Sequence, residues 1–230
     1  MKLIVTCEHG GNTIPKAFEK YFKGSELVLN SHRGYDLGTL DVFNALKPLA
    51  NESLYSETSR LLIELNRSLH HKSLFSEFTK NISKKEKQHL INSHYLVYRK
   101  KVENTIQNWI EKGESVLHIS VHSFTPILNN VERNCDIGLL YDSKKNTEKT
   151  FCSDFKKELK NLKPGLNVRY NYPYLGKADG FTTYLRKQFE SNYIGVEIEI
   201  NQKYSTKNNM SSELKVFLFS ALKTLLTKSN

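Results

Sequence analysis

Short apolar runs rich in β-branched residues recur along the chain and indicate buried strands. The clearest runs lie at residues 3–7, 115–121, 135–141 and 193–200. The run LLIEL at residues 61–65 is a further candidate strand.

The segments between these runs carry the spacing of amphipathic helices. In residues 84–112, apolar side chains recur three and four positions apart with Lys, Glu and Gln between them, and Gly113 follows as a stop. Residues 36–48, 147–161 and 211–227 are also expected to be helical. This alternation predicts an α/β fold of three layers, with a mostly parallel or mixed central sheet and helices on both faces.

The length and composition limit the class of protein. A chain of 230 residues with 38% hydrophobic and 25% charged residues fits one large domain, so we expect a single catalytic domain over residues 1–230. No apolar run approaches the roughly 20 residues of a membrane helix. The N-terminal run resembles a first strand rather than a signal peptide, so a cytoplasmic protein without a membrane partner is expected.

The net charge of +10 raises the question of nucleic acid. The lysines are mixed with acids and form no basic block, which favours a solvated surface and no nucleic-acid partner. A positive field can still attract a small anionic substrate. The 3 cysteines are widely spaced, which favours buried apolar residues over disulfides or a metal knuckle. The oligomeric state has no signature in the sequence.

Polar residues gather where the predicted strands end. In sheets of this kind, ligands bind beyond the carboxyl ends of the strands. The residues at these positions are Glu8, His9, His122, Ser123, Glu197 and Glu199.

Two of these residues suggest a metal site. Neutral imidazole is the commonest metal ligand, and a catalytic zinc takes three protein ligands and one open position. His9 and His122 are therefore candidate ligands, and Asp36 fits as the third. Each residue also has a simpler interpretation, because a histidine is often an ordinary hydrogen-bonded polar residue and Asp36 could be a helix N-cap.

Glu197 and Glu199 share one face of a strand that is otherwise apolar. A carboxylate in such a strand is either a general base for an activated water or part of the solvated face of an edge strand.

Arginines offer a binding site for a substrate carboxylate. Arg60 and Arg67 flank Glu64 in SRLLIELNRS, where surface ion pairs are the alternative interpretation. Arg133, Asn171 and Arg186 are weaker candidates for substrate binding.

Seven motifs in order resemble the N-formylglutamate amidohydrolase family over residues 1–202. They are EHGGN (8–12), HRGYDLGTLD (32–41), SRLLIELNRS (59–68), HISVHSFTP (118–126), CDIGLLYD (135–142), NYPYLGKADG (171–180) and VEIEINQ (196–202). The resemblance implies a fold similar to zinc-dependent exopeptidases (phosphorylase/hydrolase-like) and to zinc muramoyl amidases.

The resemblance also implies roles. His9, Asp36 and His122 correspond to the ligands of one divalent metal, with zinc expected and iron, cobalt or nickel also suited to the donor set. Glu199 corresponds to the general base. Arg60, Asn66 and Arg67 lie in a motif expected to bind substrate, and Glu8, Ser123 and Glu197 are expected to support the site. The related exopeptidases carry a glutamate ligand where this chain has Asn12, so the acidic ligand is assigned to Asp36, as in the muramoyl amidases.

The implied activity is metal-dependent hydrolysis of a small anionic N-acyl amino acid. The expected reaction converts N-formyl-L-glutamate to formate and glutamate, in the context of histidine breakdown. One alternative is a zinc carboxypeptidase or amidase acting on a peptide or a peptidoglycan stem. A second alternative is a basic binding protein without enzymatic activity.

Overall fold

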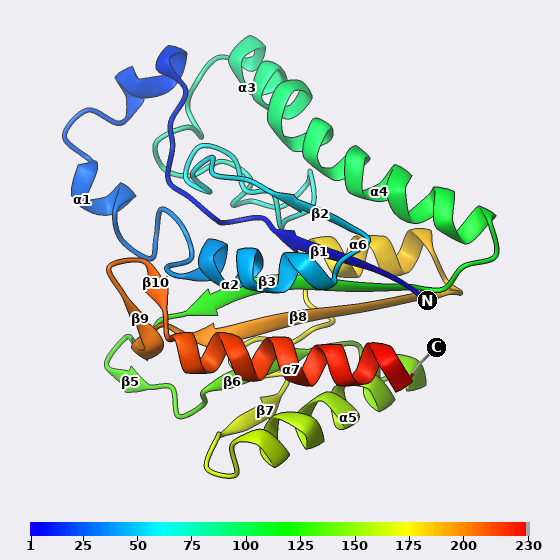
Figure 1. Ribbon diagram of the computed structural model, residues 1–230. Helices are drawn as coiled ribbons and strands as arrows, with labels where there is room; N and C mark the ends of the chain where they lie inside the picture. The colour runs from blue at the N-terminus through cyan, green and yellow to red at the C-terminus, as the bar shows by residue number, and fades with distance from the viewer. Residues whose placement is uncertain (229–230) are drawn as a thin grey trace.

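The structure is a computed structural model that describes residues 1–228, and its centre is a six-stranded sheet of order β2-β1-β3-β8-β6-β7 (Figure 1). The strands are β1 (Lys2–Cys7), β2 (Glu52–Tyr55), β3 (Val116–Phe124), β6 (Ile137–Leu140), β7 (Val168–Tyr170) and β8 (Tyr193–Asn201). β2, β1, β3 and β8 run parallel, whereas β6 is antiparallel to β8 and parallel to β7. The sheet is therefore mixed, as the sequence allows.

The helices connect these strands. They are α1 (Glu26–Leu29), α2 (Thr39–Leu46), α3 (Lys84–Leu90), α4 (Leu96–Glu111), α5 (Asn146–Leu162), α6 (Phe181–Gln188) and α7 (Ser212–Lys228). A π-helical turn at Ile91–Tyr95 joins α3 to α4, so that 84–111 form one helical rod. Two short hairpins pair β4 (Ile127–Leu128) with β5 (Val131–Glu132) and β9 (Ser205–Thr206) with β10 (Asn209–Met210). None of the helices in residues 1–228 is both long and apolar enough to cross a membrane.

Two apolar clusters cover the two faces of the sheet and make the three layers. On one face, α2, α5 and α7 pack against the strands through residues such as Phe43, Phe155 and Leu218. On the other face, α4 and α6 contribute Ile106 and Phe181. Figure 1 shows α4 and α7 on opposite sides of β3 and β8. The predicted three-layer architecture is confirmed.

The two faces of the central strands differ in polarity. Side chains alternate along a strand, and the face toward α7 is apolar in β1, β3 and β8 up to Ser123 near the end of β3, whose hydroxyl donates to Leu37 O. The face toward α4 becomes polar near the carboxyl ends of the strands, where Ser120 pairs with Glu197 and His122 pairs with Glu199 in register. These polar side chains are buried. The sheet thus brings ionisable groups from separate strands to one edge of one face.

The predicted helices and four of the five predicted strands are confirmed within a few residues. The helix expected at 36–48 begins only at Thr39, because the preceding Gly38 takes a left-handed φ of 79°. The sequence pattern missed β2, β7 and α6, of which the strands are only 4 and 3 residues long.

The predicted strand at 61–65 is wrong. These residues are buried in the second apolar cluster but form turns rather than a ladder. Their backbone groups are satisfied locally, since Leu62 N donates to Ser59 O and the Thr79 hydroxyl donates to Leu62 O. Burial of an apolar run therefore does not require strand pairing where turns and hydroxyl groups satisfy the backbone.

A substitution at Gly138 in β6 tests how closely the 171–180 loop packs against the sheet. A Cβ at this position would collide with the carbonyl oxygen of Tyr172. We expect Gly138→Ala to lower the free energy of unfolding by about 1–3 kcal/mol, the usual cost of overpacking. Gly165→Ala is the control, because a Cβ there meets nothing within 4 Å. Equal denaturation midpoints for the two variants would contradict this packing.

Candidate active site

Three predicted residues meet at the carboxyl edge of the sheet. His9 follows β1, His122 lies in β3, and Asp36 precedes α2. The Oδ2 atom of Asp36 lies 3.3 Å from His9 Nδ1 and 3.0 Å from His122 Nδ1. All three side chains are buried, and their candidate ligand atoms lie within 4.8 Å of one another.

Each imidazole is oriented by a second carboxylate on its other nitrogen. His9 Nε2 contacts Glu64 Oε1, and His122 Nε2 lies 3.2 Å from Glu8 Oε2. An ionised carboxylate only accepts hydrogen bonds, so each Nε2 carries its hydrogen toward a glutamate. A neutral ring then directs the lone pair of Nδ1 toward Asp36. Two lone pairs facing one carboxylate require a positive charge between them.

The pKa values reflect the same requirement. Burial disfavours a charged His122, but Asp36 and Glu8 raise its pKa well above the ordinary value. Burial and Arg60 oppose a charge on His9, while Glu64 and Asp36 raise its pKa overall. Burial acts against ionisation of Asp36, yet His9 and Arg60 hold its pKa well below the ordinary value. The cluster therefore stabilises positive charge at the Nδ1 atoms, either as protons or as a metal cation.

This donor set fits a divalent metal. Two imidazoles and one carboxylate, each oriented by an outer partner, form the arrangement that zinc and similar ions use in proteins. The second partners, Glu8 and Glu64, match the outer carboxylates that commonly fix metal-binding histidines.

Arg60 joins the acids of the cluster. Its Nη1 donates to Asp36 Oδ1 at 2.9 Å, and its Nε and Nη2 donate to Glu64 Oε2 at 2.9 and 2.6 Å. The guanidinium is thus occupied on two sides by residues that hold the histidines. This geometry makes Arg60 a positioning residue more than a free binding group.

Glu199 is a buried acid with an unused oxygen. It sits beside His122 in register, and its Oε2 has no hydrogen-bond partner within residues 1–228. Burial is the main cause that raises its pKa, to about 7. A carboxyl group with a pKa near neutrality and a free oxygen can exchange a proton with a bound molecule.

A cavity of about 270 Å³ opens above these groups, and we call it the inner cavity. Asn66 and Ser123 line it together with Glu197 and Glu199, and the 171–180 loop closes one side with Tyr174 and Asp179. The complete lining is His9, Asp36, Arg60, Asn66, Arg67, His122, Ser123, Leu140, Tyr174, Leu175, Ala178, Asp179, Glu197 and Glu199.

A chain of buried hydrogen bonds lies beneath the cluster. Glu8 accepts from Ser120 Oγ at 2.6 Å and from the Tyr98 hydroxyl at 2.9 Å. Burial lowers the pKa of His118 to about 4, and this ring bonds Thr6 and Tyr193. His118 lies four residues before His122 on the same face of β3, but it belongs to this underlying network.

Comparison with known proteins agrees with the motif pattern. The profile of the family described as N-formylglutamate amidohydrolase matches residues 1–205. The chain belongs to this family. Membership supports an amide hydrolase, and the family resemblance predicted from the seven motifs is confirmed.

Solved structures share the fold of this family member. A gene product of Agrobacterium tumefaciens superposes with a TM-score of 0.80 at 24% identity, covering 99% of this chain and 91% of that one. An N-formylglutamate amidohydrolase from Ralstonia eutropha gives a TM-score of 0.71 at 15% identity, covering 99% of this chain and 95% of that one. The comparison with curated proteins gave no significant match.

Three predicted substrate-binding residues do not line the inner cavity. Arg186 is buried in an ion pair with Glu148 at 2.8 Å and also donates to Gly195 O. Asn171 accepts from the backbone amide of Tyr141, directly after β6, and from that of Gly176 in its own loop. Arg133 bonds the Tyr174 hydroxyl at 3.2 Å, behind a residue of the cavity wall.

The structure contradicts the alternative interpretations of the acidic residues as edge-strand, helix-capping or surface ion-pair residues. β8 lies between β3 and β6, so Glu197 and Glu199 are not on a solvated edge strand. Asp36 does not cap α2, whose N-cap residue is Gly38 and makes no side-chain cap bond. Glu64 is buried against His9 and is no surface ion-pair residue. Sequence reasoning missed this role because it depends on a turn that brings Glu64 beneath a distant strand end.

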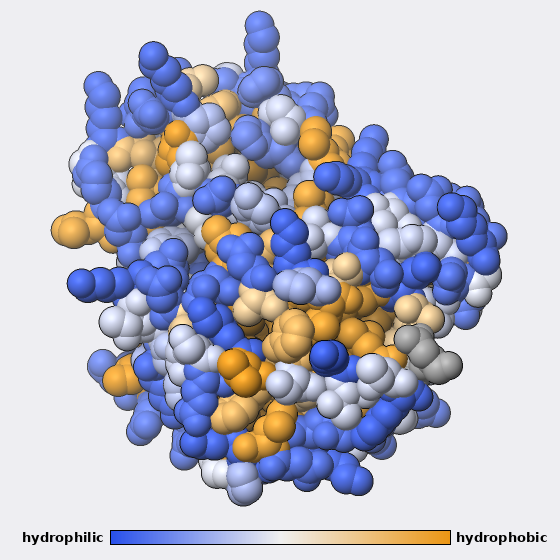
Figure 2. Space-filling view, viewed as in Figure 1, coloured by the Kyte–Doolittle hydropathy of each residue, from blue (hydrophilic) through white to orange (hydrophobic). Residues whose placement is uncertain are grey.

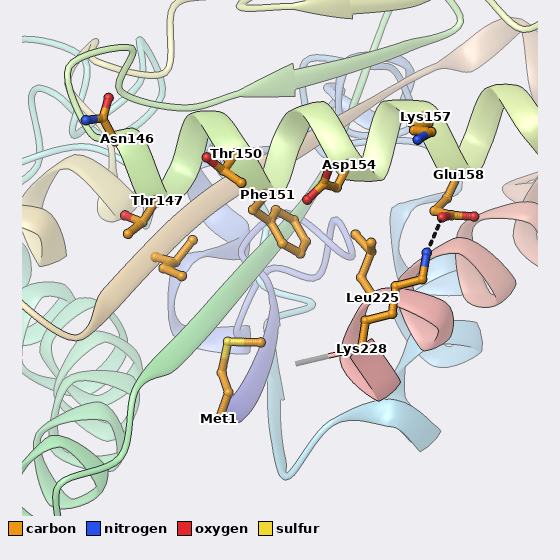
Figure 3. Close-up of a pocket in the computed structure, with 11 residues that line it drawn as sticks. Met1, Asn146, Thr147, Thr150, Phe151, Asp154, Lys157, Glu158, Leu225 and Lys228 are labelled. Carbon is orange, nitrogen blue, oxygen red and sulfur yellow. Dashed lines mark hydrogen bonds and ion pairs between the residues drawn. The ribbon is translucent and has the colours of Figure 1, made fainter. Parts of the chain in front are cut away.

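Another cavity, of about 620 Å³, lies between α5 and α7 beside Met1 (Figure 3). Phe151 and Leu225 point into it, and a Glu158–Lys228 ion pair of 2.7 Å closes one end. It lies at the amino end of β1, away from His9 and His122. Figure 2 shows hydrophobic side chains gathered over α7 on this side of the molecule. No histidine lines this cavity among the described residues, so of these two cavities only the inner one holds the histidine cluster.

The raised pKa of Glu199 predicts a pH-dependent stability in protein freed of metal by a chelator. The folded state keeps its proton up to a pH of about 7, whereas the unfolded chain loses it near 4.5, so this residue's contribution to stability falls as the pH rises between the two. Measured by urea unfolding, Glu199→Gln should gain up to about 3 kcal/mol relative to the wild type across this window. A constant difference between the two proteins from pH 4.5 to 7 would contradict the shift.

Proposed function

We propose that this protein is a metal-dependent amidohydrolase of small N-acyl amino acids, with residues 1–230 forming one catalytic domain. The observation that supports it most is the convergence of two Nδ1 atoms and Asp36 beside Glu199, which has a free buried oxygen. His9, Asp36 and His122 would hold one divalent cation, for which zinc suits the donors. When bound, such a cation polarises an amide carbonyl and makes water more acidic.

Glu199 would act as the general base. Its carboxylate takes one proton from the attacking water, whose oxygen bonds to the carbonyl carbon of the amide. The same carboxyl group then returns the proton to the leaving nitrogen as the carbon–nitrogen bond breaks. The products are a carboxylic acid and an amine, and one water is consumed. Burial raises the pKa of Glu199 above that of an ordinary glutamate, which makes its carboxylate a stronger base toward water.

Arg67 is the favoured partner for a substrate carboxylate. Arg60 also lines the inner cavity, but Asp36 and Glu64 already occupy its guanidinium. Within residues 1–228 the Arg67 side chain makes one hydrogen bond, from Nη1 to the backbone oxygen of Asp179, which leaves other N–H groups for a ligand. Asn66 holds the neighbouring loop by accepting from Phe181 N at 2.7 Å. The two arginines therefore have different roles, with Arg60 positioning the ligands and Arg67 binding substrate.

N-formyl-L-glutamate is the substrate we propose first, with formate and glutamate as products. The family supports this choice, and the volume of about 270 Å³ suits a small molecule. Its two carboxylates also suit a protein of net charge +10.

Replacing the general base tests the mechanism. Glu199→Gln should lower kcat by about 10²–10⁴-fold on the substrate that is turned over, with the metal content unchanged. Glu197→Gln is the matched control, since Glu197 lies on the same strand face but bonds the Thr182 hydroxyl at 2.5 Å. Formate release from N-formyl-L-glutamate is measured beside a panel of N-acetyl amino acids, dipeptides and a peptidoglycan stem peptide.

Each negative outcome removes a different part of the proposal. Turnover of another amide without formate release would contradict the named substrate and keep the mechanism. A larger loss in Glu197→Gln than in Glu199→Gln would assign the base to Glu197. Purified protein without stoichiometric metal, and a His122→Ala variant with unaltered metal uptake, would contradict the metal site and favour a binding protein.

The outer carboxylates give a prediction about metal affinity. Glu64→Gln removes the charge that holds His9 Nε2, so the metal dissociation constant should rise about 10–100-fold. Competition with a chelating dye measures it, and circular dichroism checks the fold. Glu111→Gln, on the exposed side of α4, is the control and should bind metal like the wild type. Equal affinities in both variants would show that Glu64 does not support the metal site.

A further inference from the structure

A second cavity of about 450 Å³ adjoins the inner cavity, and we call it the outer cavity. The two cavities share Arg60 and Arg67 as lining residues. The segment from His71 to Lys80 forms most of the remaining wall. The complete lining is Arg33, Arg60, Leu61, Glu64, Arg67, His71, Lys72, Ser73, Phe75, Ser76, Glu77 and Lys80.

The charges of the outer cavity are not balanced. Glu77 pairs with Arg33, and Glu64 pairs with Arg60. These are its only acids, and neither Lys72 nor Lys80 forms an ion pair among residues 1–228. Arg67 likewise contacts a backbone carbonyl rather than a carboxylate. Arg67, Lys72 and Lys80 therefore form no ion pair among residues 1–228, although the charge of Lys80 contributes to the lowered pKa of Glu77, and the five cations of the lining outnumber its two acids.

The wall that carries Arg67 is firmly held. The Tyr95 hydroxyl, from the π-helical turn, donates to Arg67 O at 2.7 Å. Arg99 of α4 donates to Leu65 O at 3.0 Å and packs its guanidinium against the ring of Phe181. Backbone fixed in this way presents the Arg67 side chain at the boundary of both cavities.

The positive field extends to the neighbouring loop. Burial is the first cause that lowers the pKa of His32, and the charges of Arg33, Arg133 and Arg60 lower it further. A field of this sign favours a bound anion and disfavours a cation.

We propose that the outer cavity is an oxyanion subsite that binds a carboxylate or a phosphate through Arg67, Lys72 and Lys80. This proposal rests on the proposed function in the case where the anion is a carboxylate of the substrate far from the amide that is cleaved. Such a substrate places its amide in the inner cavity and continues past Arg67, as an N-formyl dipeptide with a second glutamate does. A free anion beside a smaller substrate has the same chemistry.

Kinetics on two substrates tests the substrate arm. The wild type is compared with Lys72→Gln/Lys80→Gln on two substrates. The quantity compared is the kcat/KM for N-formyl-glutamyl-glutamate divided by the kcat/KM for N-formyl-L-glutamate. The double variant should lower this ratio by roughly 3- to 10-fold, mainly through KM, because exposed charge pairs contribute modestly. Added salt should lower the wild-type ratio in the same direction. Lys101→Gln/Lys223→Gln removes two exposed charges elsewhere and should leave the ratio unchanged.

Calorimetry with inorganic phosphate tests the free-anion arm and does not depend on catalysis. The wild type should bind phosphate, and Lys72→Gln/Lys80→Gln should bind it several-fold more weakly. Loss of phosphate binding without a changed substrate ratio would assign the subsite to a free anion. Equal phosphate binding and an equal substrate ratio in the wild type and the double variant would overturn the subsite. Loss of the proposed function would appear separately, as absent hydrolysis with phosphate binding intact.

Discussion

The buried carboxylate of Asp36 is the interaction on which the site depends. An ionised acid in a dry environment is unstable unless cations and donors surround it. Here His9, His122 and Arg60 all contact it, and each comes from a different part of the chain. Three elements must reach their final positions before this charge is compensated. The carboxylate thereby couples the packing of β1, β3 and the 59–67 segment to the geometry of the site.

Compensation extends outward in pairs. On the side away from Asp36, His9 contacts Glu64 and His122 contacts Glu8. Arg60 forms ion pairs with both Glu64 and Asp36. Every buried charge in this set has an opposite charge as a neighbour, so their pKa values favour the ionised acids and the positive rings. Glu199 is the exception, because its Oε2 has no partner in the described chain and burial raises its pKa. Chemistry is expected where compensation is incomplete.

The sheet makes this arrangement possible at low cost to the core. Alternation along β1, β3 and β8 assigns one face, up to Ser123 of β3, to apolar packing against α2, α5 and α7. The other face keeps an apolar base near Val116 and Tyr193 and becomes polar only toward the carboxyl ends. Polar side chains of neighbouring strands then satisfy one another, as Ser120 does with Glu8. The stability of the core and the demands of the site are therefore met on separate surfaces of the same strands.

The sequence by itself determined four of the six strands of the central sheet, most of the helices and the residues at the strand ends, because alternation and helical spacing are local properties. It also carried the motifs by which the family is recognised. The partners of Glu64 and the failed strand at 61–65 were decided by tertiary structure, since a buried apolar run looks the same in a ladder and in a turn. Tertiary structure also decided the different roles of Arg60, Arg67 and Arg186. Each is an arginine near a motif, and only the three-dimensional positions of Asp36, Asp179 and Glu148 distinguish a positioning residue, a cavity wall and a buried ion pair.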